Sequence, residues 1–101
     1  MVKEEQEQKK QKVSLGRIVH YTLTAAQAAE AKKQRGVVGG AAVGQRTIEE
    51  GNVCPMIITA VWNAENGTVN GQAFLDGNDS LWVTSVDEGA GPGKWCWPPR
   101  V

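Results

Sequence analysis

The chain has 101 residues and a mass of 10.9 kDa, and a chain this short supplies one hydrophobic core, which excludes several domains. Eleven Lys and Arg balance eleven Asp and Glu, so the formal net charge is zero, which argues against a partner such as long DNA or RNA. No apolar run approaches the ~20 residues of a membrane span, and the start, MVKEEQEQKKQK, is unlike a signal peptide. These features predict one intracellular domain with no membrane partner.

The N-terminal part predicts a tail, a strand and a helix. Residues 1–12 are rich in Gln, Glu and Lys, so they form either a solvated tail or a polar helix that becomes ordered on assembly. The β-branched and aromatic residues from Arg17 to Leu23 predict a first strand. Thr24 is suited to cap a helix, Ala-rich helix formers follow it, and Gly36 stands where that helix would end.

The predicted helix is followed by a flexible apolar loop. The helix has no large apolar residue on any face, so it is either a surface appendage or packs closely on a partner helix. Residues 36–44, GVVGGAAVG, are Gly-rich and apolar. Residues 24–44 are therefore expected to form an insertion in a single domain that spans residues 13–101.

The remaining segments predict short strands that are joined by tight turns. Residues 45–52 are polar and turn-like, and Pro55 places the beginning of the next strand at a sheet edge. Asn66-Gly67 is typical of a hairpin turn, and a last turn at Pro92-Gly93 leads to the C-terminal segment. The strands that follow residue 52 are expected at 53–62, 68–75 and 81–86, with a turn at 76–79.

These elements predict a mainly β fold. Four or five short strands with one inserted helix favour a small SH3-like or OB-like antiparallel β-barrel, with a possible second helix at the N-terminus. Side chains fill the interior of such a barrel, so a ligand site is expected on a face or between subunits. The tail, the helix and the apolar loop add little to a core, and they predict a homo-oligomer in which they form the interface.

Five motifs resemble a known group of proteins. GRIVHYTL, PMIITAVW, VNGQAFLDGND, LWVTSV and GPGKWCWPP lie within about residues 14–101. Together they are similar to a widespread family of small, uncharacterised bacteriophage and prophage proteins that end in a Trp-x-Trp-Pro motif. The resemblance implies a phage gene, a compact β-fold and a location in the host bacterial cytoplasm, but no activity. The middle position of the last motif is often His in that family, and here it is Cys96.

Motifs for metals, cofactors and catalysis are incomplete in this sequence. Asp76–Ser80 begins like a calcium loop, but Leu81 and Asp87 stand where that loop needs Gly and Glu. Zinc needs about four ligands, and the chain has one His and two Cys. No GxSxG or phosphate-loop spacing is present. The protein is therefore expected to be no enzyme, to use no metal or cofactor, and to keep Cys54 and Cys96 as free thiols.

Four Trp provide most of the large side chains, and they are the first candidates for binding. Trp95 and Trp97 are two positions apart, so they face one side of an extended segment. They either fill the core and its lid or line a pocket that stacks a planar ligand such as a nucleobase, with Arg17, Arg46 and Arg100 near a phosphate. The candidate binding residues are Trp62, Trp82, Trp95, Trp97, His20, Arg17, Arg100, Asp76, Asn78 and Asp79.

These inferences favour a non-enzymatic phage accessory protein. It would assemble as a homo-oligomer and, in a counter-defence role, sequester a small nucleotide-like host signal or block a host protein. The alternative is a virion structural protein, either a capsid decoration or a connector component, for which a near-neutral β-barrel with extended arms is also suitable.

Overall fold

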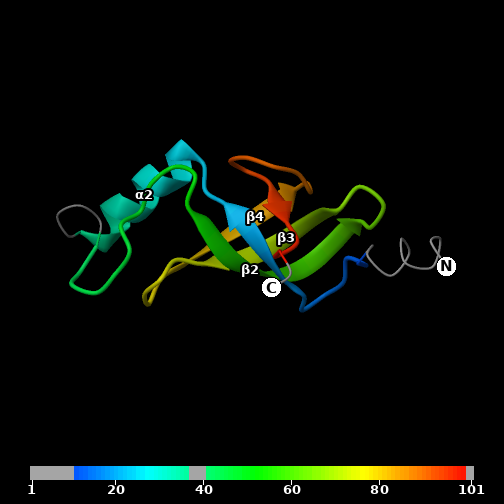
Figure 1. Cartoon of the computed structure of the whole chain (residues 1–101), viewed down its shortest axis with the longest axis horizontal. Helices are drawn as coiled ribbons and strands as arrows, with labels where there is room; N and C mark the ends of the chain where they lie inside the picture. The colour runs from blue at the N-terminus through cyan, green and yellow to red at the C-terminus, as the bar shows by residue number, and fades with distance from the viewer. Residues whose placement is uncertain (1–10, 37–40, 100–101) are drawn as a thin grey trace.

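The computed structural model describes residues 11–36 and 41–99, which contain five strands and one helix (Figure 1). The N-terminal helix considered above, the middle of the Gly-rich loop and Arg100 lie outside these described residues. In chain order the elements are β1 (Ile18–Thr22), α2 (Ala25–Arg35), β2 (Val53–Asn63), β3 (Thr68–Phe74), β4 (Ser80–Val86) and β5 (Trp95–Cys96).

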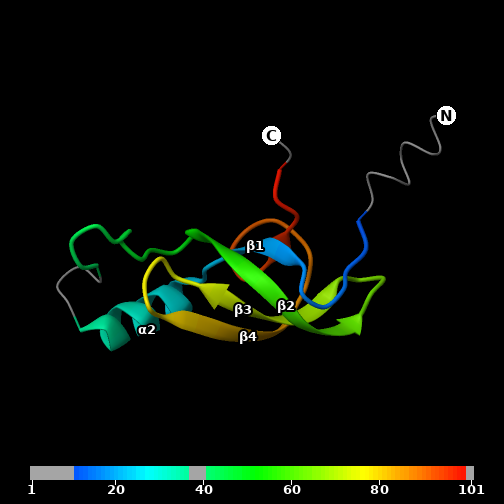
Figure 2. The ribbon, with the colours of Figure 1, turned by 90° about the horizontal axis from the view of Figure 1, so that it is seen from below.

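The strands form one antiparallel sheet in the order β4-β3-β2-β1-β5 (Figure 2). β2, β3 and β4 follow one another through tight turns, and β5 returns to pair with β1. Beyond β4, Glu88 forms a parallel bridge with Trp95, and the Gly89 N–H donates to the Trp95 carbonyl at 2.9 Å. This bridge brings the two edges of the sheet together, so the predicted mainly β, barrel-like fold is confirmed.

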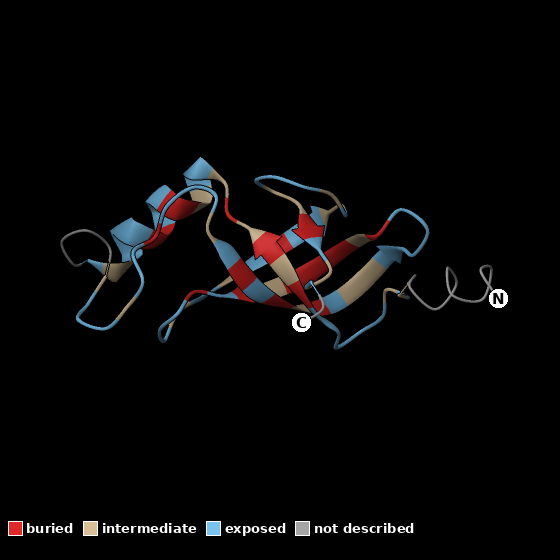
Figure 3. Cartoon of the chain, viewed as in Figure 1, coloured by how far each residue is buried: buried red, intermediate tan, exposed pale blue. Residues whose placement is uncertain are grey.

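Alternation along the strands builds the core (Figure 3). In β2, Cys54, Met56 and Ile58 are buried, whereas Pro55, between the first two of them, is exposed. Gly71 on β3 faces inward, where a Cβ atom would lie 2.5 Å from Met56 Cγ, so this position has no room for a side chain. Trp95 is fully buried, and its indole N–H donates to the Gly67 carbonyl at 2.7 Å, which gives this buried polar group its partner.

Pro55 occupies the position that the sequence predicted for it. The ladder between β2 and β3 begins only at Met56, although β2 already pairs with β1 from Val53 onward. The Ile58 N–H points toward β1 and donates to the Arg17 carbonyl. Successive N–H groups along a strand point alternately to its two neighbours, so the backbone nitrogen of Pro55, three residues earlier, points toward β3. The missing N–H of Pro55 is therefore on the β3 side, where that ladder has not yet begun.

α2 begins and ends where its capping residues predict. The Thr24 hydroxyl accepts the Gln27 N–H, the Gln27 side chain accepts the Thr24 N–H, and Gly36 closes the helix at φ 69°. Only Ala28 and Ala31 of the helix are buried, and α2 lies beyond one end of the strands instead of covering the sheet (Figure 1). Within the described ranges, no helix has the length and apolar composition that crossing a membrane requires.

Candidate functional site

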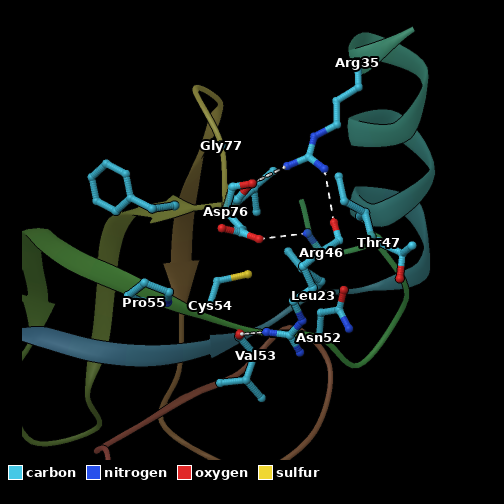
Figure 4. Close-up of a pocket in the computed structure, with 13 residues that line it drawn as sticks. Leu23, Arg35, Arg46, Thr47, Asn52, Val53, Cys54, Pro55, Asp76 and Gly77 are labelled. Atoms are coloured by element: carbon cyan, nitrogen blue, oxygen red, sulfur yellow. Dashed lines mark hydrogen bonds between the residues drawn. The ribbon is translucent and has the colours of Figure 1, made fainter. Parts of the chain in front are cut away.

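A pocket of about 500 Å³ lies where the end of α2, residues 46–48 and the turn after β3 meet the start of β2 (Figure 4). This volume is within the range of about 300–1,000 Å³ that is typical of small-molecule sites. Its apolar lining includes Leu23, Cys54 and Leu75, together with Phe74, whose side chain remains 43% exposed. The polar lining residues are Arg35, Arg46, Thr47, Asn52 and Asp76.

Arg35 joins α2 to the turn between β3 and β4. Its Nε donates to Asp79 Oδ2 at 2.7 Å and its Nη2 to Asp79 Oδ1 at 3.0 Å, so the contact is bidentate. Arg35 also donates to the Leu75 carbonyl and, at 3.3 Å, to the Arg46 carbonyl. The hydrogen bond to Arg35 lowers the pKa of Asp79, and the same bond raises the pKa of Arg35. Both groups therefore stay charged at neutral pH, and the pair holds one wall of the pocket in place.

Arg46 is the exposed cation of the pocket. Its backbone N–H donates to Asp76 Oδ2 at 2.8 Å, which fixes the chain beside the β3–β4 turn. Its guanidinium Nη1 donates to the Val53 carbonyl at 3.4 Å, near the upper limit for a hydrogen bond (Figure 4). This side chain is therefore held weakly and is placed to meet an anionic group on a ligand.

Apart from the pocket, two aromatic side chains and an arginine cluster near the C-terminal segment. Trp97 is half-buried and packs edge-on against Trp95, with 5.3 Å between ring centroids and 86° between the planes. The Arg17 guanidinium lies 4.9 Å from the Trp97 ring centroid and donates to Gln11 Oε1 at 2.6 Å. Arg17 and Trp97 thus come together, whereas Trp95 belongs to the core and has no surface with which to meet a ligand.

Three other predicted residues lie on the outer face of the sheet. His20 is half-buried and stands opposite Pro55 on one side and Cys96 on the other. Trp62 and Trp82 are 66% and 61% exposed, and the Trp62 indole N–H donates to Asn70 Oδ1 at 2.8 Å. None of these three residues lines the pocket.

Among the predicted residues that the structure describes, which leaves out Arg100, Asp76 and Arg46 line the pocket and the others do not. Asp79 is engaged by Arg35, and Asn78 is exposed in the same turn. The sequence reasoning missed Phe74 because its place in a strand indicated a core residue. It missed Arg35 because basic residues in a last helical turn are ordinary, and nothing in the order of residues pairs this one with Asp79.

The two cysteines lie apart in the fold. Within the part of the chain that the structure describes, no cluster of three or more His, Cys, Asp or Glu is placed to hold a metal ion. Both Cys are free, with Cys54 buried and Cys96 exposed, because they point to opposite faces of the sheet. Burial raises the pKa of the Cys54 thiol.

The motifs that carry the resemblance to phage proteins coincide with the strands. GRIVHYTL contains β1, PMIITAVW contains most of β2, and GPGKWCWPP contains β5. They contribute core residues such as Val19, Met56 and Trp95, so packing accounts for much of their pattern. Comparison of the chain with protein-family models, with curated proteins and with solved structures gives no match.

Proposed function

We propose that this chain is a non-enzymatic binding protein that holds a small, nucleotide-like ligand in the pocket beside α2. The observation that carries the proposal is one pocket of about 500 Å³ that combines an apolar lining, an exposed aromatic ring and a weakly held cation. A nucleotide presents a planar base and an anionic phosphate, which are the complements of the ring and the cation.

Two residues suit the two parts of such a ligand. Phe74 offers a ring for the base to stack on, and contacts of this kind are worth about 1–3 kcal/mol per base. Arg46 faces the phosphate and can form two parallel hydrogen bonds to it. Asn52 and Asp76 also line the pocket, and their side chains suit the amine and hydroxyl groups of a nucleoside.

The chemistry of the lining favours binding over catalysis. Cys54 supplies the thiol in the pocket lining, and a raised pKa keeps that thiol protonated and weakly nucleophilic at neutral pH. No His is among the lining residues, so the thiol has no neighbouring imidazole there to activate it.

The resemblance to phage proteins supports a biological role for this pocket. A homo-oligomer in the host bacterial cytoplasm that sequesters a nucleotide-like signal would act in counter-defence. The second candidate, a capsid decoration or connector protein, is favoured by the large exposed side chains on the outer face of the sheet. Mass spectrometry of purified particles separates the two, because a decoration protein is present in them at high copy number and a sequestering protein is not.

The pocket is tested by calorimetry with adenosine and AMP as probes. AMP should bind more tightly than adenosine, and Arg46→Ala should weaken AMP binding by about 10–100-fold, the loss of one charged hydrogen-bond partner, with little effect on adenosine. Arg17→Ala is the matched control, because that guanidinium lies over Trp97, outside the pocket. Equal AMP affinity in the wild type and Arg46→Ala would contradict the proposed site, as would absence of any bound small molecule in native mass spectrometry of protein from infected cells.

A further inference from the structure

The five strands contain no Lys, Arg, Asp or Glu. None of the eleven basic and eleven acidic residues lies in β1, β2, β3, β4 or β5. The outward side of a solvent-facing sheet normally carries charged residues that keep it in water. Here the charges are confined to the helix, the loops and the terminal segments, so the outer face of the sheet has only neutral side chains and the imidazole of His20.

The register places four large uncharged side chains, three of them apolar, in one row across that face. Ile18 stands opposite Ile57, Ile57 opposite Gln72, and Gln72 opposite Trp82. These positions alternate with buried ones, so they project outward, and Ile18 remains 57% exposed. The row therefore crosses four adjacent strands from β1 to β4.

Further exposed rings extend the row into a patch. Phe74 lies two residues beyond Gln72 on β3, and the ring of Trp62 is tied to Asn70 on the same strand. Trp62 and Trp82 alone expose roughly 300 Å², more than a third of the ~800 Å² that one partner contributes to a standard interface. We name the outer-face patch by its six main residues: Ile18, Ile57, Trp62, Gln72, Phe74 and Trp82.

We propose that a second copy of this chain covers the outer-face patch, in a dimer with two-fold symmetry. A two-fold axis sets a surface against itself, and an uncharged surface meets itself without like charges in contact. Recognition of a different protein is commonly steered by complementary charges, and this face has none to offer. Depletion of charge and enrichment in Trp and Phe are the composition of an interface centre.

The edge of the sheet supports the same conclusion. The Glu88–Trp95 bridge lies beyond the end of β4, so the strand itself is outermost beside β3, and its sequence SLWVTSV has neither the Lys nor the Pro that commonly protects an exposed edge. A partner seated on Trp82 covers this edge as well. The proposed interface therefore lies on the sheet. The composition of the sequence indicates instead an interface formed by the helix, the loop and the tail.

The test is the mass of the full chain by light scattering and sedimentation, over a dilution series from micromolar to submillimolar protein. The wild type should be a dimer or a multiple of one. Gln72→Arg and Trp82→Lys should each be monomeric at concentrations where the wild type is associated, because each places a positive charge from both subunits in an interface that has no negative charge to pair with it. Leu15→Lys, which changes a 67% exposed apolar residue outside the patch, should leave the mass unchanged.

The outcomes separate this inference from the ligand proposal. Phe74 belongs to both the patch and the pocket, whereas Gln72 and Trp82 do not line the pocket, so the variants at these two positions test the patch alone. Arg46→Ala should keep the wild-type mass. Circular dichroism checks the fold, and Gln72→Arg replaces a half-buried polar residue, so the test does not depend on the Trp variant. A wild type that stays monomeric throughout the series overturns the inference and leaves a different protein as the occupant. Retention of the wild-type mass by both variants overturns it too.

Discussion

At the scale of single residues, neighbouring aromatic side chains have different roles. Trp95 and Trp97 belong to one short motif, yet Trp95 is fully buried with its N–H bonded to Gly67. Trp97 lies outside the core and is half-buried between the Trp95 ring and the Arg17 guanidinium. The same residue type two positions apart thus supports the core in one case and the surface in the other.

This difference has a measurable consequence for stability. Trp95→Ala should lower the free energy of unfolding by about 3–5 kcal/mol, because it leaves a large cavity and an unpaired Gly67 carbonyl. Trp97→Ala should cost about 1–2 kcal/mol, from partial burial and the loss of one cation–π contact. Urea unfolding followed by circular dichroism measures both, and equal losses would show that Trp97 is as much a part of the core as Trp95.

The two thiols should differ in reactivity. Cys96 is exposed and should react at once with an alkylating reagent, whereas Cys54 is buried with a raised pKa and should react only after unfolding. Mass spectrometry of the labelled protein counts the modified sites with and without urea. Double labelling of the folded chain would contradict the burial of Cys54, and Cys96→Ser is the control that leaves one slow site.

At the scale of elements, the Arg35–Asp79 pair attaches α2 to the sheet. The helix buries only two Ala side chains, so hydrophobic contact alone holds it weakly. Arg35, whose side chain is 7% exposed, forms a bidentate bond to a turn that lies 44 residues further along the chain. Removing the Asp79 carboxylate removes this bidentate bond.

Asp79→Asn should therefore lower the free energy of unfolding by roughly 1.5–3 kcal/mol at pH 7, the usual range for a hydrogen bond to a charged group. Because folding lowers the pKa of Asp79, the stabilisation is present above its unfolded value of about 3.9 and is lost as pH falls through the folded pKa. When the free energy of unfolding is measured at a series of pH values from 7 to 2, it should fall less with decreasing pH for the variant than for the wild type. Glu65→Gln, in the exposed turn after β2, is the control that should follow the wild type.

The elements themselves were largely predictable, because local chemistry sets their limits. Thr24 and Gly36 cap α2 as their residue types require, and the turn at Asn66-Gly67 joins β2 to β3. Ile48 was not foreseen as a core residue, since its neighbours are polar and no periodicity marks it. The pocket was not foreseen either, because it joins segments whose contacts only the tertiary fold creates.

At the scale of the whole molecule, the proposed interface on the sheet makes the N-terminal tail unnecessary for self-association. The sequence predicts an interface that includes residues 1–12, whereas the outer-face patch lies entirely on the strands. A chain that lacks residues 1–10 should therefore assemble with the same number of subunits as the full chain, as measured by light scattering. Dissociation of the truncated chain at concentrations where the full chain stays associated would return the interface to the tail.

The pairing of β5 with β1 also determines how this chain folds. Tyr21 and Trp95 lie near opposite ends of the described chain, and their contact closes the sheet. A long loop must lose its freedom before that contact forms, so folding should be slow for a domain of this size, in the range of milliseconds to seconds. Until then the inner faces of β2 and β3 should remain open to solvent, and we expect Trp95 to be the last to pack and to exclude water from them. In stopped-flow refolding, Trp95→Phe should remove the late fluorescence change, while an early phase from the β2–β4 meander remains.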